Sequence, residues 1–354
     1  MYSLKPIHHL LRHRLGLSAD ALQDMASRSW QIAPPERRRV EPVIILAGQV
    51  DRITRTEFAS LEMVKRSLQG DPAEQIGPTT AHLIRDAQII DGVLYAGRGA
   101  LHLRARKSWP KPVQLPSIDH AALYETWVGN RWFGNWLLDD CLSYRLAEAA
   151  GQPITTMPER SGHVPAYERL LGMTPQRITN LHIRELILFD DPYNNSHRLA
   201  RAQDMRKRLM QGITPDDNFG VFLLRRTSGD ARILDNEADL ARRLQENYGF
   251  RVIFAEDHSV EDLMRICGAA RVIAGVEGSQ LNHGIAVMPA GGTLFTLQPA
   301  DRATTAMKLL SDRFQQSFAM LVSKDPASRF SIAWDEVAQT MDRIIAQKEA
   351  SHVV

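Results

Sequence analysis

Residues 271–299 read RVIAGVEGSQLNHGIAVMPAGGTLFTLQP and contain the pattern that decides the fold. The run 271–274 is apolar and rich in β-branched side chains, which favour a strand. The apolar spacing of 281–288 predicts a helix, and the pair Gly291 and Gly292 breaks it before a second strand. The stretch therefore predicts a strand, a turn, a helix and a strand in one parallel sheet.

The polar turn of this unit, residues 275–282, is a candidate anion site. Backbone N–H groups at a strand-to-helix turn point outward, and the partial positive charge of a helix start attracts phosphate. Gly278 lets a ligand approach the backbone closely because glycine has no Cβ. An ordinary βα turn is the alternative interpretation, since glycine is common in such turns.

Strands and helices alternate on both sides of this stretch. Residues 219–226 and 250–256 have strand patterns, and a helix between them runs to Tyr248 and ends at Gly249. Strict alternation indicates right-handed βαβ units in a parallel sheet that is covered on both faces. The C-terminal half is therefore expected to be a doubly wound α/β domain.

The N-terminal half begins differently. Residues 41–106 have strand and turn patterns, including runs at 42–48 and 87–97, and strands alternate with helices only after them. The chain is longer than one core usually grows, so we expect an α/β fold of two Rossmann-like domains that face a cleft. The predicted boundaries are an N-terminal domain at 1–211, a C-terminal domain at 212–331, and a helix at 332–354 that could return to the first domain.

The composition is that of a soluble globular protein, with 44% hydrophobic and 24% charged residues. A net charge of +2 is too small to predict nucleic-acid binding. Cys141 and Cys267 have apolar helical surroundings, which argues against a disulfide framework or a zinc site. No apolar run is long enough for a membrane span or a secretory signal, so we expect a cytoplasmic protein. A basic helix at 197–211 leaves a peripheral membrane contact open, and a homodimer also stays open.

Three polar turns are expected at the carboxyl ends of the C-terminal strands, where doubly wound sheets bind ligands. Arginines at a strand end suit a bidentate grip on a diphosphate, and a carboxylate there can hold ribose hydroxyls. Solvated arginines and a helix cap are the alternatives. The candidates are Arg225, Arg226, Arg232, Asn236 and Glu237 after the first strand, Glu256 after the second, and Glu277, Gly278, Ser279, Gln280, Asn282 and His283 after the third.

The order of these motifs resembles glycosyltransferase family 61, whose members are often described as capsular polysaccharide biosynthesis proteins. The similarity covers about 219–299 and consists of an Arg-Arg pair, Arg-Ile-Leu-x-Asn-Glu, Ser-Val-Glu-Asp, Gly-x-x-Gly-x-x-Leu and an apolar Pro-x-Gly segment. The segment WVGNRWFGNWLLDD at 127–140 also resembles an N-terminal motif of the family. Glu277 and Asn135 stand where members of the family usually have histidine.

The resemblance implies a GT-B fold, a nucleotide-sugar donor on the C-terminal domain, a glycan or lipid-linked glycan acceptor, and inversion at the transferred sugar. Inversion needs a base for the acceptor hydroxyl and positive charge for the leaving diphosphate. We expect that charge from Arg225, Arg226, Arg232 and the turn at 277–282. No Asp-x-Asp motif lies at a strand end, so we expect no metal and no cofactor besides the nucleotide-sugar substrate.

Four side chains are candidate bases: Asp139, Asp140, His163 and Glu277. Asp139 ranks first because it lies four residues after Asn135, so both side chains share one helix face on the acceptor side. His163 could instead cap a helix, and Glu277 could instead bind a donor sugar hydroxyl. Trp132 could stack on an acceptor sugar, although tryptophans at helical spacing usually belong to a core.

Two other functions stay open. A polysaccharide pyruvyl-type transferase on a similar two-domain scaffold would share the anion-binding turn. A binding-only relative, suggested by the two replaced histidines, would keep nucleotide affinity without turnover and would serve as a scaffold in a synthesis complex.

Overall fold

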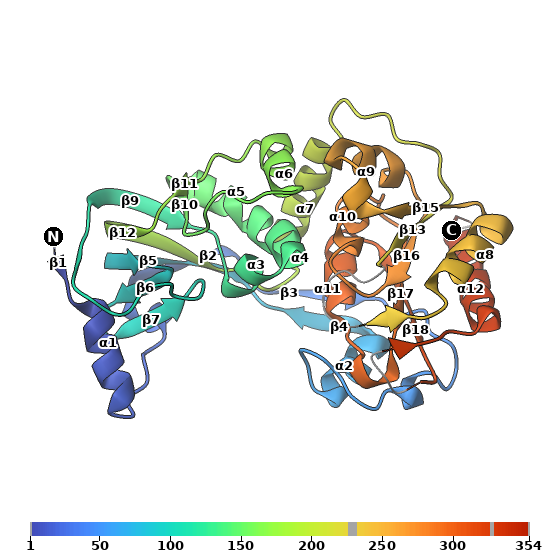
Figure 1. Ribbon diagram of the computed structural model, residues 1–354, viewed down its shortest axis with the longest axis horizontal. Coiled ribbons are helices and arrows are strands. Elements are labelled where there is room, and N and C mark those ends of the chain that lie inside the picture. The colour runs from blue at the N-terminus through green and yellow to red at the C-terminus, as the bar shows by residue number, and fades with distance from the viewer. Residues whose placement is uncertain (1, 226–231, 326–328, 353–354) are drawn as a thin grey trace. The chain divides into compact units, whose positions relative to one another are not determined.

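The computed structural model describes residues 2–225, 232–325 and 329–352, and it confirms the predicted α/β class (Figure 1). The chain divides into two compact units, each built from two segments. Unit 1 comprises Met1–Glu36 and Gly77–Arg201, and unit 2 comprises Arg37–Ile76 and Ala202–Val354.

Unit 2 contains the parallel sheet that the sequence predicts. Its strand order is β15 (Phe250–Phe254), β13 (Gly220–Leu224), β16 (Val272–Val276), β17 (Thr293–Gln298) and β18 (Ser317–Val322), and all neighbours are parallel. Helices α8 (Glu237–Tyr248) and α12 (Trp334–His352) cover one face, and α9 (Val260–Cys267), α10 (Leu281–Ile285) and α11 (Ala306–Arg313) cover the other, as Figure 1 shows. Both faces are buried, which explains why the strands are apolar without alternation.

The core of unit 2 includes the C-terminal helix. Phe222 and Phe295 from the sheet pack with Val337, Met341 and Ile344 from α12. The helix predicted to return to the N-terminal domain therefore lies on the sheet of unit 2, because its apolar side chains complete the core there.

Residues 37–76 also belong to unit 2, in contrast to the predicted boundary at 211. Ile44 forms an isolated bridge with Ala319 of β18, and the expected strand at 42–48 is reduced to this bridge. Arg52 donates to both carboxylate oxygens of Glu336 on α12, at 3.0 and 2.6 Å. These contacts fix the segment to the edge strand and to the last helix, although almost 300 residues separate the partners in sequence.

Unit 1 contains a mixed sheet. The strand order is β11 (Gln176–Arg177), β10 (Pro153–Thr155), β9 (Ser117–Leu123), β12 (Asn180–Asp190), β5 (Thr79–Ile90), β6 (Val93–Ala96) and β7 (Gly99–His102), and β2 (Ala26–Ala33) also pairs with β5. Strands β9 to β12 are parallel, whereas β12, β5, β6 and β7 are antiparallel. Only the part of the sheet formed by β11, β10, β9 and β12 therefore has the parallel, Rossmann-like pairing that we expected for this domain.

The remaining elements are short strand pairs and helices. The pairs are β1 (Tyr2–Ser3) with β8 (Val113–Gln114), β3 (Glu36–Val40) with β4 (Asp71–Ile76), and β14 (Ile233–Leu234) with β19 (Arg329–Phe330). The helices are α1 (Lys5–Arg14), α2 (Leu61–Gln69), α3 (Trp127–Arg131), α4 (Phe133–Asn135), the π-helical turn η3 (Trp136–Asp140), α5 (Cys141–Ala150), α6 (Val164–Leu171) and α7 (Ser196–Leu209). Helix α5 packs on β9, β10 and β12.

Candidate functional site

The sheet of unit 2 reverses its strand order between β13 and β16. The chain passes from β13 to β15 at one edge and then returns to β16 on the other side of β13. Doubly wound sheets bind their ligands at the carboxyl ends of the strands that flank such a reversal. The residues at these two ends are Arg225 and Glu277, so two of the predicted donor-binding turns meet at this position.

Arg225 spans the two turns. Arg225 is only 4% exposed. Its Nη1 atom donates to the carbonyl oxygen of Glu277 at 3.2 Å and to Oε1 of Gln280 at 3.5 Å. Gln280 donates from Nε2 to the carbonyl oxygen of Val276 at 2.6 Å. The backbone N–H of Arg225 donates to Oε1 of Glu237 at 2.8 Å. Arg225, at the end of β13, is thus held against the turn after β16 by buried polar contacts.

Arg232 forms an ion pair with Glu277, and the two side chains are 9% and 6% exposed. Loss of either partner of a buried ion pair leaves an uncompensated buried charge. The structure therefore brings a second buried arginine to the strand-order reversal and gives Glu277 a defined partner.

Asn282 supplies an unsatisfied polar atom in the segment that follows β16. The residue is 1% exposed, and its Nδ2 atom donates to the carbonyl oxygen of Ser279 at 3.1 Å. Its Oδ1 atom accepts no hydrogen bond from any residue that the structure describes. Buried carbonyl oxygens normally have a partner, so this atom is an acceptor still available for a hydrogen bond.

The turn itself differs from the predicted anion cradle in three respects. Helix α10 spans only Leu281–Ile285, and a helix this short supports only a weak dipole. The N–H groups of Glu277, Leu281 and Asn282 donate to carbonyl oxygens of Leu297, Gly278 and Ser279. The space beside Gly278, predicted to admit a ligand, holds the guanidinium of Arg225. The candidate anion-binding groups at this turn are therefore side chains more than backbone amides.

The other predicted donor residues have different positions. Asn236 uses its side chain to bind the backbone of Ile332, at 2.8 and 3.2 Å, and does not cap α8. Glu256 lies in an exposed 3-10 turn at the end of β15, next to β13 in the sheet, and His283 is buried within α10. Arg226 lies outside the described residues.

In unit 1, Asp139 lies in the π-helical turn η3 between α4 and α5. Asn135 donates from Nδ2 to Oδ2 of Asp139 at 2.9 Å, so the structure brings together the two residues predicted to share a face. Arg198 donates from Nη2 to Oδ1 of Asp139 at 2.7 Å. The Asp139 side chain is 21% exposed, and π-helical turns are frequent at functional sites.

Arg198 belongs to a buried network that sequence reasoning missed. Asp191 accepts from Arg201 at 2.9 and 2.8 Å and from the Thr79 hydroxyl at 2.7 Å, and Arg198 lies 3.6 Å away. Burial raises the pKa of Asp191, but the hydrogen bonds and charges of these arginines outweigh it and hold the pKa below its usual value. The sequence feature that could have indicated this network is the i, i+3 spacing of Arg198 and Arg201, which places both side chains on one face of the helix. Each arginine directly precedes a buried apolar residue of α7.

The other candidates on this side make different contacts. Asp140 is fully buried and accepts from the backbone N–H and the hydroxyl of Thr126, at 3.2 and 2.8 Å, which is a structural role at the start of α3. His163 is the N-cap residue of α6 without a capping side-chain hydrogen bond. Trp132 is half-buried, and the guanidinium of Arg131 lies 4.6 Å from its ring centroid.

The family model for glycosyltransferase 61 matches residues 116–295, just over half of the chain. The chain belongs to glycosyltransferase family 61. It is therefore a glycosyltransferase, a class of enzyme that uses a sugar donor and a glycan acceptor. The match covers the η3 turn in unit 1 and both arginine-bearing turns in unit 2. No curated protein sequence matches the chain significantly.

Two further features of this glycosyltransferase bear on its surroundings. Within the described residues, His, Cys, Asp and Glu side chains form no group of three or more that could hold a metal ion. None of the helices described has the length and apolar character needed to cross a membrane.

On the basic helix α7, Arg198 and Arg201 are buried in unit 1 contacts, and Arg206 donates to the carbonyl oxygens of Val287 and Gly268. These arginines are engaged within the protein, so they do not form a basic surface for lipid.

Proposed function

We propose that this family 61 enzyme transfers a sugar, with inversion, from a nucleoside-diphosphate donor held at the β13 and β16 ends of unit 2. One observation carries the proposal: two buried arginines, Arg225 and Arg232, lie at the strand-order reversal. Preorganised cations in a site with little water stabilise the charge that develops on a leaving diphosphate far better than cations in solution. The acceptor belongs to surface or capsular polysaccharide synthesis, and the two units work in a GT-B arrangement.

The donor would be recognised by charge and by hydrogen bonds. Arg225 and Arg232 contribute cationic donors for the phosphate oxygens. Glu277 keeps Arg232 in position and is a poor candidate for the base, because its carboxylate is buried in an ion pair. Oδ1 of Asn282 accepts from a hydroxyl of the sugar or ribose, which satisfies the buried oxygen.

Asp139 is the base that we propose for the acceptor. Its carboxylate takes the proton of the acceptor hydroxyl while the acceptor oxygen forms a bond to the anomeric carbon. The bond from that carbon to the diphosphate oxygen breaks, and the electron pair leaves with the diphosphate. Arg198 and Asn135 orient the carboxylate through the hydrogen bonds described above. Trp132 remains the proposed stacking surface for an acceptor sugar.

The test is turnover across a panel of nucleotide-sugars with a glycan acceptor, with the anomeric configuration of the product read by NMR. The proposal expects an inverted product, activity that survives a chelator, and at least a hundredfold loss in Arg225→Ala or Arg232→Ala. A retained anomeric configuration contradicts the mechanism, and loss of activity with EDTA that returns with a divalent cation contradicts metal independence.

A binding-only role is the second candidate, and Glu277 favours it. A glutamate locked by Arg232 cannot replace the proton chemistry of a histidine, so the chain could keep the donor without transferring its sugar. Nucleotide binding by calorimetry without hydrolysis or transfer from any donor would select this role. Product formation from one donor rules it out.

A further inference from the structure

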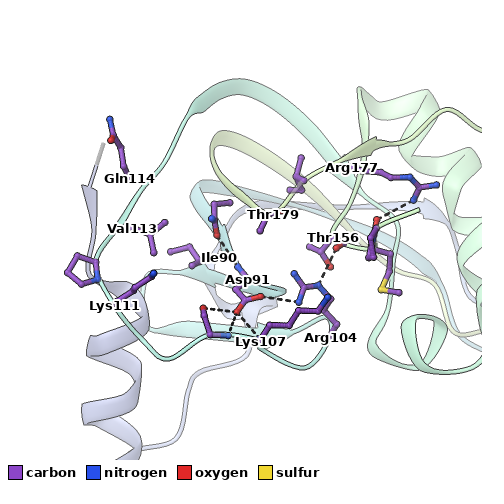
Figure 2. A pocket seen from close by; sticks show the side chains of 16 residues that line it. Ile90, Asp91, Arg104, Lys107, Lys111, Val113, Gln114, Thr156, Arg177 and Thr179 are labelled. Carbon is purple, nitrogen blue, oxygen red and sulfur yellow. Dashed lines mark hydrogen bonds and ion pairs between the residues drawn. The ribbon is translucent and has the colours of Figure 1, made fainter. Parts of the chain in front are cut away.

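Unit 1 contains a cavity of about 680 Å³ at the hairpin end of β5 (Figure 2). Its walls come from the loop after β7, from residues 156–158 after β10, and from residues 177–180 before and at the start of β12. Pockets for small ligands commonly enclose about 300–1,000 Å³. The cavity therefore has room for a sugar ring with its substituents.

This cavity is separate from the Asp139 network. Strands β5 and β12 pair from Ile90 and Asn180 at the cavity to Thr80 and Asp190 at the other end, which leads to Asp191 and Arg198. Ten residue steps along a strand span about 33 Å, at about 3.3 Å for each residue. The cavity lies at the opposite end of the same two strands, too far away to be part of the proposed base site.

Asp91 organises one wall of the cavity, as Figure 2 shows. Its carboxylate accepts from Arg104 Nη1 at 3.1 Å, from the N–H of Lys107 at 2.8 Å, and from the N–H and hydroxyl of Ser108 at 2.7 and 2.9 Å. Burial raises the pKa of Asp91, but these hydrogen bonds outweigh it and keep the pKa below its usual value. The carboxylate thus stays charged and holds Lys107 at the cavity.

The charges that line the cavity are predominantly positive. Among the described residues that line the cavity, Asp91 is the only carboxylate, and it is paired with Arg104. Arg177 donates to Glu168 at 2.9 and 2.7 Å. Lys107 and Lys111 also line the cavity and are exposed, and neither has an ion-pair partner within the residues described. Two ammonium groups are therefore available to an anion.

One buried hydroxyl in the lining points to a polar ligand. Thr156 is 3% exposed, and its Oγ1 atom has no hydrogen-bond partner in the described part of the chain. Its backbone N–H and carbonyl are both used, by Glu125 at 2.8 Å and by Arg104 at 3.2 Å. Thr179 and Asn180 add further polar side chains, and Ile178 and Pro112 add apolar surface. Hydroxyls, amides and apolar side chains together suit the edges and faces of a sugar ring.

We propose that this cavity binds an acidic sugar unit of the glycan acceptor, a ring that carries a carboxylate or a phosphate. Lys107 and Lys111 bind the anionic group, and Thr156 hydrogen-bonds a ring hydroxyl. The role as an acceptor subsite rests on the proposed function, whereas binding of the acidic sugar does not. A glycan that is bound here and extended at the transfer site is an acidic polymer, so the acceptor class is an acidic polysaccharide.

The experiment is calorimetric titration of the full chain at low ionic strength with trigalacturonate, glucose 6-phosphate, inorganic phosphate and neutral maltotriose. The test variant is Lys107→Ala/Lys111→Ala, since exposed substitutions rarely disturb folding. The matched control is Lys65→Ala/Lys207→Ala, which removes the same charge elsewhere. We expect about tenfold weaker binding of the preferred acidic sugar in the test variant and unchanged binding in the control. Weaker binding in both variants would indicate a general charge effect and overturn the proposal.

A second variant, Thr156→Val, separates a sugar site from a simple anion site. It removes the buried hydroxyl at nearly constant shape, so we expect about fivefold weaker sugar binding with phosphate binding unchanged. If trigalacturonate binds more tightly than glucose 6-phosphate, the acidic group of the sugar is a carboxylate. If glucose 6-phosphate binds more tightly, the acidic group is a phosphate. Equal binding of inorganic phosphate and glucose 6-phosphate without binding of trigalacturonate, or no binding of any acidic sugar, overturns the proposal. UDP titrated into the same samples reports on the donor site separately, so failure of either site is seen independently of the other.

Discussion

Arg225 fills the space that a side chain at position 278 would need. A Cβ atom built on Gly278 would meet Nη1 of Arg225 and would lie 2.5 Å from Oε1 of Gln280. The backbone of Gly278 does not lie in the left-handed region, so its lack of a side chain serves this close approach. Glycine at this motif position is thus explained by an arginine that must cross the turn.

The Gly278→Ala variant is expected to displace the guanidinium of Arg225. We predict a loss of about 1–3 kcal/mol in the free energy of unfolding, the usual cost of overpacking a buried site. Nucleoside diphosphate binding should weaken at least about tenfold because a bidentate cation leaves its position. Urea denaturation and calorimetric titration measure the two effects.

A double-mutant cycle provides the control for that prediction. In an Arg225→Ala background, position 278 has room for a methyl group, so Gly278→Ala should cost little further stability or affinity. An equal cost of Gly278→Ala in both backgrounds would mean that the glycine serves some purpose other than making room for Arg225.

The Arg232 and Glu277 pair should couple strongly. Glu277→Gln leaves a buried guanidinium without its counter-charge, and we expect a loss of about 3–5 kcal/mol in the free energy of unfolding. Arg232→Met leaves the carboxylate unpaired and should cost a similar amount. The double variant should lose at least about 1 kcal/mol less than the sum of the single variants, measured by urea denaturation. Additive losses would contradict a direct pair.

Asp139→Asn tests the proposed base. The amide keeps an oxygen for Arg198 but cannot take a proton, so we expect the turnover rate to fall by about 10²–10⁴-fold with donor affinity unchanged. His163→Ala is the comparison variant and should retain most of the turnover. If His163→Ala loses activity and Asp139→Asn keeps it, the base assignment moves to His163.

Asp140 should make stability depend on pH in a predictable direction. Burial raises the pKa of its carboxyl well above the usual 3.8, and the charges of Asp139 and Glu125 add to this, while the Thr126 hydrogen bonds oppose it. The stability that the neutral carboxyl contributes is fully present below 3.8 and is lost as pH rises through the raised pKa. The loss approaches about 1.4 kcal/mol for each pH unit in that interval.

Urea denaturation of the wild type and of Asp140→Asn at a series of pH values checks this prediction. The asparagine cannot ionise, so the wild type should become less stable relative to the variant as pH rises from about 4. A stability difference that does not change with pH would show that Asp140 titrates alike in the folded and unfolded chains.

Local patterns predicted the sheet of unit 2 because its strands and helices alternate along the chain, so each strand packs against elements that are close to it in sequence. The alternation of apolar runs and the stop at Gly249 are properties of neighbouring residues. The Ser-Val-Glu-Asp motif is local in the same way, because Ser259 accepts from the N–H of Asp262 at 3.1 Å. Arg225, Arg232 and Glu277 could be proposed for the same reason, since they follow two of these strands.

The parts that sequence reasoning missed depend on distant contacts. The ion pair between Arg52 and Glu336 joins residues 284 positions apart, and no local pattern assigns residues 37–76 to unit 2. The inward position of Arg198 and Arg201 follows from the carboxylates of Asp139 and Asp191, which lie outside α7, so the pattern of 197–211 indicated only a basic helix. The ion pair between Glu277 and Arg232 could not be predicted from local patterns either, because 45 residues separate the two in sequence.

Calorimetric titration with UDP and the other nucleoside diphosphates tests the central claim most directly. The account predicts that at least one of them binds the wild-type chain, that Arg225→Ala and Arg232→Ala each weaken this binding at least about tenfold, and that Arg225→Lys restores only part of it. Saturating nucleotide should also raise the melting temperature of the wild type. Absence of binding by every nucleoside diphosphate, or equal affinity in the wild type and both alanine variants, would contradict a donor site at Arg225 and Arg232.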